Sequence, residues 1–108
     1  MNEIKKIAQY SILFDFYNSL LTKKQKEYFI MYFENDYSLK EIADYYKISR
    51  NAVHSTLTTT IKKLEDYENK LNLAEKNKQK KEYYLKYQKT KDEKYIKKIM
   101  EVEDNYGF

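Results

Sequence analysis

The chain has 108 residues and a formal net charge of +4, with 21 Lys and Arg residues against 17 Asp and Glu residues. It has no Cys, no Pro and one Gly, which excludes disulfides and thiolate metal sites and argues for all-α structure. This length fits one domain with a buried core plus a tail. The basic balance suits a polyanionic partner, but Lys, Asn, Tyr, Ile and Phe all have A/T-rich codons, so the charge is weak evidence.

The first segment, residues 2–21, has apolar residues at the spacing of one helix face. They are Leu13, Phe16, Tyr17, Leu20 and Leu21. Asp15 interrupts the early apolar run and no small-residue cleavage site follows it, so we do not expect a signal peptide. No apolar stretch approaches the ~18 residues that a membrane span needs. We therefore expect a cytoplasmic protein without a membrane span.

Two short helices with the same start signal follow. Thr22–Gln25 and Ser38–Glu41 both have capping-box spacing, in which a hydroxyl and a Gln or Glu side chain satisfy each other's backbone amides. The loop between the helices is expected at Asn35–Tyr37. The residues expected to be buried are Tyr28, Phe29, Tyr32 and Phe33 in the first helix, and Leu39, Ile42, Ala43 and Tyr46 in the second.

A third, longer helix is expected after a turn at Lys47 and Ile48, with Ser49 as its N-cap. Its apolar positions continue far along the chain, so we expect the helix to run past Leu71. These positions are Val53, Leu57, Ile61, Leu64, Tyr67, Leu71 and Ala74.

The last two of these helices have the spacing of a helix-turn-helix, in which two helices cross at a steep angle. Ala43 is small enough for a close crossing, and Val53, ten residues later, is the apolar residue expected to fill the contact. Lys47 stands at a turn position that often has φ > 0, where a residue other than Gly costs about 1 kcal/mol. The fold expected is an all-α helix-turn-helix bundle with a long second helix.

From Lys76 the composition changes, and residues 76–108 contain ten Lys and six acids. We expect a charged C-terminal helix, broken near Thr90, or alternatively a frayed tail over the last ten residues. The domain boundaries expected are therefore 1–75 and 76–108. Two sets of apolar residues each have helical spacing. The first is Tyr83 and Tyr87, and the second is Tyr95, Ile99, Val102 and Tyr106.

Residues Leu21–Glu65 resemble region 4 of bacterial sigma factors. The motifs that carry the resemblance are Gln25-Lys26, Glu41-Ile42-Ala43, Ser49 to Val53, and Lys62-Lys63-Leu64. A sigma factor also needs a polymerase-binding region before this segment, and the preceding 20 residues are too few for one. The resemblance therefore implies a sigma-region-4-like fold without the function of a sigma factor.

A longer stretch, Phe14–Val53 followed by Leu64–Leu71, is similar to the YlxM family of small bacterial helix-turn-helix proteins. These proteins are encoded beside the signal recognition particle protein. The resemblance implies a role in the signal recognition particle pathway, with the particle's RNA or its GTPase as partner. It implies little about residues 76–108.

The second helix of such a motif places its N-terminal part in the major groove. Arg50 suits guanine or phosphate and Asn51 suits adenine, whereas hydroxyls and lysines suit phosphates. The alternative is an ordinary solvated helix face, on which His54 by default is a surface residue. The nucleic-acid contacts predicted are Arg50, Asn51, His54, Ser55, Thr58, Lys62 and Lys63, with Thr59 and Thr60 as weaker members of the hydroxyl run.

Aromatic and basic residues also alternate in the tail. Tyr83, Tyr84 and Tyr87 could stack on unpaired bases, as in single-strand binders. The alternative is an amphipathic helix that docks on the body or on a second subunit of a homodimer. The tail contacts predicted are Lys80, Lys81, Tyr84 and Lys86.

Three functions fit these features: a nucleic-acid-binding regulator of the secretion machinery, a DNA-binding transcription regulator, and a protein-interaction module acting on a GTPase. An enzyme is not expected, because the chain has one His, no Cys and no phosphate-binding glycine loop. No metal or cofactor is expected either.

Overall fold

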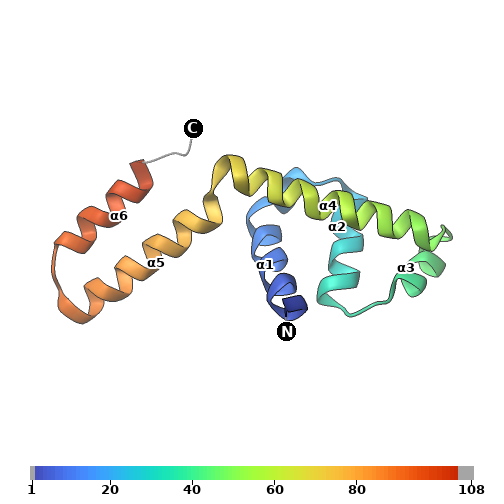
Figure 1. The fold of residues 1–108 in the computed structure, drawn as a ribbon, viewed down its shortest axis with the longest axis horizontal. Helices are drawn as coiled ribbons and strands as arrows, with labels where there is room; N and C mark the ends of the chain where they lie inside the picture. Colours follow the sequence, from blue (N-terminus) through green and yellow to red (C-terminus); the bar gives the residue numbers. More distant parts are fainter. Residues whose placement is uncertain (1, 105–108) are drawn as a thin grey trace. The chain divides into compact units, whose positions relative to one another are not determined.

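The computed structural model describes residues 2–104, with side chains from Lys5 to Asp104, so Tyr106 and the rest of 105–108 lie outside the described residues. Within this range the secondary structure is helical, as the sequence predicts, with six α-helices in order along the chain (Figure 1). The chain divides into two compact units between Asp66 and Tyr67, whereas the sequence predicted a boundary after residue 75.

The first unit contains α1 (Asn2–Tyr17), α2 (Lys23–Phe29), α3 (Leu39–Tyr46) and most of α4 (Arg50–Leu71). Both predicted capping boxes are present. The Thr22 hydroxyl accepts the Gln25 amide at 3.2 Å, and the Ser38 hydroxyl accepts the Glu41 amide at 3.0 Å. Each box satisfies amides that the first helical turn leaves without a partner, which fixes where α2 and α3 begin.

Aromatic residues form the part of the core that joins α1 to the rest of this unit. Phe29 is fully buried and stacks on Phe14 with ring centroids 4.4 Å apart, while Phe33 packs against Phe29 at 4.6 Å. Tyr17 and Leu21 complete the contact of α1 with the body and are also buried. Offset aromatic pairs of this kind add about 0.5–1.5 kcal/mol each to the energy of burial.

In α1 and in the two short irregular helices of this unit, the buried residues differ from those that the sequence predicted. A 3-10 turn, Asn18–Leu20, follows α1, and Leu20 in it is half exposed. Within α1 the buried face contains Phe14 and Tyr17 rather than Leu13, and Leu21 is buried with them. A wide π-helical turn, Ile30–Glu34, follows α2, and Tyr32 is exposed rather than buried. Tighter and wider turns change the rotation per residue, so the 3.6-residue spacing fails there.

The prediction that the third long helix runs past Leu71 is wrong, because α4 ends there and Asn72 has φ 59°. Asn tolerates this left-handed conformation better than most residues. The α5 helix (Leu73–Thr90) begins directly afterwards, and the Glu68 carboxylate accepts the amides of Ala74 and Glu75, both at 3.1 Å.

The second unit begins at Tyr67 and contains α5 and α6 (Lys94–Asp104) as a helical hairpin (Figure 1). The predicted break near Thr90 is confirmed, because α5 ends there and Lys91 has φ 56°. The members of the predicted apolar sets up to Val102 are half-buried, and the Tyr83 and Tyr95 rings stack at 6.4 Å. Every residue of α5 and α6 keeps more exposure than a core residue.

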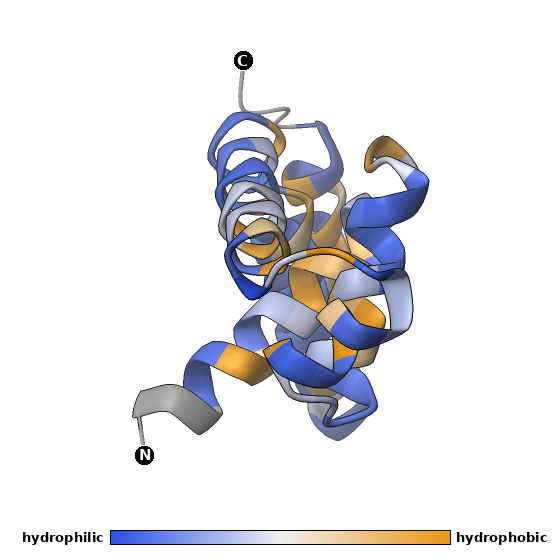
Figure 2. Ribbon diagram, turned by 90° about the vertical axis from the view of Figure 1, so that its right-hand side faces the viewer, coloured by the Kyte–Doolittle hydropathy of each residue, from blue (hydrophilic) through white to orange (hydrophobic). Residues whose placement is uncertain are grey.

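Apolar and hydrophilic residues alternate along the helices (Figure 2). None of the helices within residues 2–104 combines the length and apolar character needed to cross a membrane.

Candidate nucleic-acid interface

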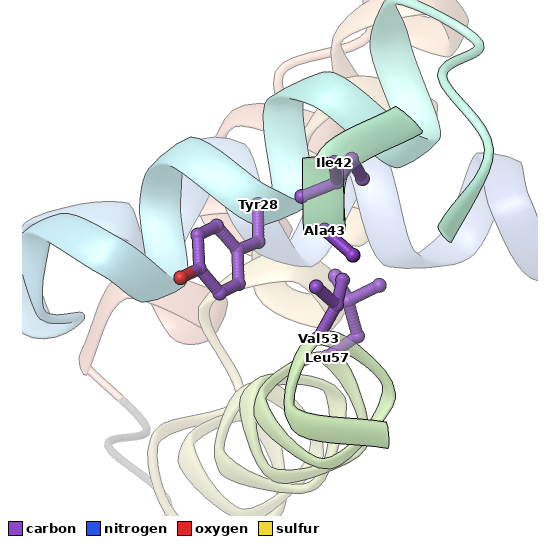
Figure 3. Close-up of a cluster of buried hydrophobic side chains, with 5 residues drawn as sticks. All are labelled: Tyr28, Ile42, Ala43, Val53 and Leu57. Atoms are coloured by element: carbon purple, nitrogen blue, oxygen red, sulfur yellow. The ribbon is translucent and has the colours of Figure 1, made fainter. Parts of the chain in front are cut away.

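The crossing of α3 and α4 has the packing that the sequence predicts for a helix-turn-helix. Ala43 on α3 faces Val53 on α4, and Ile42, Leu57 and Tyr28 surround them (Figure 3). Ile42 and Val53 are fully buried, and Ala43 is 4% exposed. Because Ala43 presents a single methyl group, the two helices can approach closely at this point. The angle of α4 to the rest of the motif is thus set by buried apolar contacts.

The turn between these helices is a Schellman motif. The Ile48 amide donates to the Ala43 carbonyl at 3.0 Å, and the Lys47 amide donates to the Asp44 carbonyl at 3.4 Å. Lys47 adopts φ 56° and ψ 46°, the left-handed conformation that Gly usually supplies at this position. The turn therefore keeps its standard geometry with a lysine that is strained there.

Replacing this lysine by glycine should stabilise the protein. Lys47→Gly removes a left-handed cost of about 1–2 kcal/mol, offset in part by the entropy that Gly adds to the unfolded chain. We expect a net gain of about 0.5–1 kcal/mol in the free energy of unfolding, measured by urea denaturation. Lys62→Gly, in the interior of α4, should lose about 1 kcal/mol. A loss in both variants would contradict the strain at Lys47.

The start of α4 is fixed by Ser49, whose hydroxyl accepts the Ala52 amide at 3.0 Å. This cap places Arg50 and Asn51 in the first turn, and both side chains are exposed. Further exposed residues follow Asn51 at helical spacing, so one polar face lies opposite the buried Val53 and Leu57. The residues of this polar face are Asn51, His54, Ser55, Thr58 and Lys62.

Two members of the predicted set lie elsewhere. Thr60, the weakest member of the hydroxyl run, is fully buried, and its hydroxyl donates to the Thr56 carbonyl at 2.7 Å, so it is a core residue. Lys63 is half-buried and lies beside the polar face rather than on it. Thr59 is exposed. Whether the exposed residues contact a nucleic acid stays a prediction.

A side-chain hydrogen bond links α3 to α2 behind this surface. The Tyr46 hydroxyl donates to Glu27 Oε2 at 2.7 Å, and the Tyr46 ring packs on Tyr28 with centroids 4.9 Å apart. Burial, followed by the hydrogen bond and the negative charge of Glu27, raises the pKa of Tyr46 to about 12. The neutral phenol is thus the form that the folded protein favours.

This shift predicts a loss of stability at high pH. The pKa of Tyr46 is higher in the folded than in the unfolded state, so its contribution is complete below about pH 10 and is lost as the pH rises towards about 12. Tyr46→Phe should lose the hydrogen bond at neutral pH but show a shallower decline over that window. Urea denaturation of both proteins from pH 8 to 11.5 gives the difference. Parallel declines would contradict the proposed coupling.

An apolar groove beside the polar face was not predicted from the sequence. It lies between α1, the wide turn after α2, and α4, and Ile7 and Tyr32 in its wall are exposed. His54 and Thr58 form its edge, so they belong both to the polar face and to the groove. The spacing of apolar residues in α1 indicates that this helix has an apolar face. The sequence does not show that this helix lies beside α4, so it does not predict the groove.

The predicted tail contacts have different surroundings in the hairpin. Lys80 forms an ion pair with Glu103, whereas Lys81 is exposed. The exposed Tyr84 accepts a hydrogen bond from the Gln88 amide at 3.1 Å. Lys86 Nζ lies 5.7 Å from the centre of the Tyr83 ring and 6.0 Å from that of Tyr95. Whether these four residues contact a nucleic acid is still a prediction.

Acidic and histidine side chains are the next candidates for chemistry in this unit. The described side chains contain no group of three or more His, Asp or Glu residues that could hold a metal ion. Glu41 has a lowered pKa because the Ser38 amide and hydroxyl bond to its carboxylate, which is a capping role. What the surface offers is hydrogen-bond donors and cations on a rigid helix.

Residues 4–103 match the family model UPF0122, described as "Putative helix-turn-helix protein, YlxM / p13 like". The UPF0122 protein YlxM of Bacillus subtilis is 41% identical over 102 residues, which are 91% of this chain and 93% of the relative. A UPF0122 protein of Anoxybacillus flavithermus is 39% identical over 106 residues, covering 93% and 96% of the two chains. One of Bacillus pumilus is 48% identical over 83 residues, covering 77% and 76%.

Proposed function

Because this chain belongs to the UPF0122 family of helix-turn-helix proteins, we propose that it is a non-catalytic nucleic-acid-binding protein that uses the start of α4. One observation carries the proposal: the first turn of α4 exposes the only Arg of the chain beside Asn51. These are the side chains best suited to bidentate contacts with guanine and adenine. The buried crossing of α3 and α4 holds them on a rigid element.

Each exposed residue of this surface has a distinct role in the proposal. Arg50 and Asn51 contact base edges or phosphates, while Ser55 and Thr58 donate hydroxyl hydrogen bonds to phosphate oxygens. Lys62 lies three turns further along the same face as Asn51, where it follows the backbone. Only two residues offer base-specific chemistry, so shape and phosphate recognition provide most of the affinity.

The biological role that we propose is that of a regulator or component of the signal recognition particle pathway. It is supported by the resemblance of Phe14–Val53 and Leu64–Leu71 to the YlxM family. The particle's RNA is the proposed ligand, with the particle's GTPase as a further partner. Such a role places the protein in the cytoplasm, and a homodimer joined through its tail remains part of the prediction.

A second candidate is a small DNA-binding transcription regulator. It is favoured by the position of Arg50 and Asn51, since the first turn is the part of a recognition helix that enters the major groove of B-DNA. The deep, narrow major groove of A-form RNA does not admit side chains in the same way. A third candidate, a protein-interaction module, is favoured by the exposed apolar groove beside His54.

Equilibrium binding of the full chain to three ligands tests the proposal. The ligands are the signal recognition particle RNA, a scrambled RNA of equal length and a duplex DNA, each measured at about 50 to 300 mM salt. Preference for the particle RNA would support the secretion role, and preference for the duplex would support a transcription regulator. Absence of binding to all three would overturn nucleic-acid binding and leave the protein-interaction module.

A further inference from the structure

The positive charge of this protein is concentrated at one place. Residues 86–98, which we call the hairpin tip, contain six Lys and two acids, a net charge of +4. The other 95 residues contain 15 Lys and Arg and 15 Asp and Glu, so their formal net charge is zero. The helix-turn-helix itself, residues 38–66, has five cations and four acids. The net charge of the chain is therefore that of the hairpin tip.

The hairpin tip comprises the end of α5, the turn after it and the start of α6. All six of its lysines are exposed. Three of them make cation–π contacts with tyrosine rings. Lys86 lies over the rings of Tyr83 and Tyr95. Lys91 Nζ is 5.6 Å from the centre of the Tyr87 ring, and Lys94 Nζ is 5.1 Å from the centre of the Tyr95 ring. Cations held in this way lose less side-chain freedom when they bind an anion.

The two acids of the tip do little to neutralise it. The Asp92 carboxylate accepts the Lys94 amide at 3.0 Å, so it caps α6, and it also lies 3.7 Å from Lys94 Nζ. Lys98 lies 3.8 Å from Glu101, outside the tip. The remaining four lysines form no ion pair with any described residue. They are Lys86, Lys89, Lys91 and Lys97.

Folding does not account for this concentration of charge. Lys89 lies in the last turn of α5, where its positive charge interacts favourably with the negative end of the helix dipole. However, Lys94 and Lys97 lie in the first turn of α6, where the dipole is positive, and Lys94 and Lys98 repel each other at i, i+4. The ion pairs of Lys94 with Asp92 and of Lys98 with Glu101 are exposed and therefore offset little of this cost. A local rule broken for so small a structural gain is typical of a functional site.

We propose that the hairpin tip binds the phosphate backbone of nucleic acid and is the principal electrostatic contact of this protein. The inference rests on the proposed function and adds a second site to it, distinct from the start of α4. The two rings of the tip, Tyr87 and Tyr95, are half-buried, and Tyr95 stacks on Tyr83, so these rings position lysines rather than receive bases. The tip therefore contributes affinity without sequence preference, while Arg50 and Asn51 supply the selectivity.

Two double variants of the full chain, each lacking two positive charges, test this site. Lys89→Gln/Lys97→Gln removes two unpaired cations of the tip. Lys70→Gln/Lys78→Gln removes two exposed cations outside it, and Lys78 lies three turns before Lys89 on the same face of α5. Both should fold normally, as judged by far-UV circular dichroism, because all four side chains are exposed.

The readout is the slope of log K against log salt for duplex DNA and for the particle RNA. Each lost phosphate contact reduces this slope by about 0.9 on B-DNA and about 0.7 on single strands. We expect the tip variant to lose about 1.4–1.8 in slope and, at 0.1 M salt, about 25- to 60-fold in affinity. The Lys70 and Lys78 variant should match the wild type in slope.

The experiment distinguishes a failure of the hairpin-tip site from a failure of the proposed function. If the wild type binds and both double variants have equal slopes, the tip is not the phosphate site, although nucleic-acid binding stands. If the wild type binds neither nucleic acid, the proposed function fails. Binding to vesicles of anionic phospholipid instead, lost in the tip variant, would overturn the inference in favour of lipid headgroups.

Discussion

Replacing Phe29 by alanine is expected to cost about 3–5 kcal/mol of unfolding free energy, the largest effect on stability that we predict. Phe29 is fully buried and stacks between Phe14 of α1 and Phe33 of the wide turn. Its removal leaves a cavity where α1 meets the body of the first unit. A small domain has about 5–15 kcal/mol of stability in total, so this one change should bring the protein close to unfolding.

Urea denaturation followed by circular dichroism measures this cost. The control is Tyr45→Ala, because the Tyr45 side chain is 72% exposed and its loss should change stability by no more than about 0.5 kcal/mol. A loss below 1 kcal/mol for Phe29→Ala would mean that α1 is not packed through this aromatic stack.

The second large effect concerns binding. Arg50→Ala/Asn51→Ala removes both side chains with bidentate chemistry, and each such contact is worth about 1–3 kcal/mol. We therefore expect affinity for the preferred nucleic acid to fall by about 2–6 kcal/mol, at least 30-fold, with little change in stability. Both residues are exposed and Ser49, not they, caps the helix.

The matched control also removes one cation and one amide from exposed positions of the first unit. Lys24→Ala/Asn35→Ala changes the formal charge equally, but neither residue lies on α3 or α4. Fluorescence anisotropy at a single salt concentration compares the two variants with the wild type. Equal losses of affinity in both variants would mean that Arg50 and Asn51 contribute only through general electrostatics.

Much of the first unit could be predicted because its signals are local. The boxes at Thr22 and Ser38 depend on residues three apart, and the pair Ala43 and Val53 is set by the spacing of one motif. The exposed face that begins at Asn51 follows from helical periodicity once the buried residues are known. Local geometry of this kind is contained in a few neighbouring residues.

The errors arose where packing between distant residues decided the outcome. Tyr32 is exposed because a wide turn replaces the regular helix while Phe29 and Phe33 pack on α1. Packing of α4 on the body places Thr60 in the core, where the Thr56 carbonyl satisfies its hydroxyl, although hydrophobic patterning assigned Ile61 to the buried face. The groove beside His54 needed α1 to lie next to α4, which no local signal gives.

A nitrogen-15 NMR titration of the full chain with the preferred nucleic acid tests most directly whether α4 is the contact surface. We predict that the amide resonances of Arg50–Thr58 shift in proportion to the bound fraction, whereas those of the core residues Tyr28 and Phe29 hardly move. Shifts confined to the groove residues Ile7 and Tyr32, with none in the first two turns of α4, would contradict nucleic-acid binding by this helix.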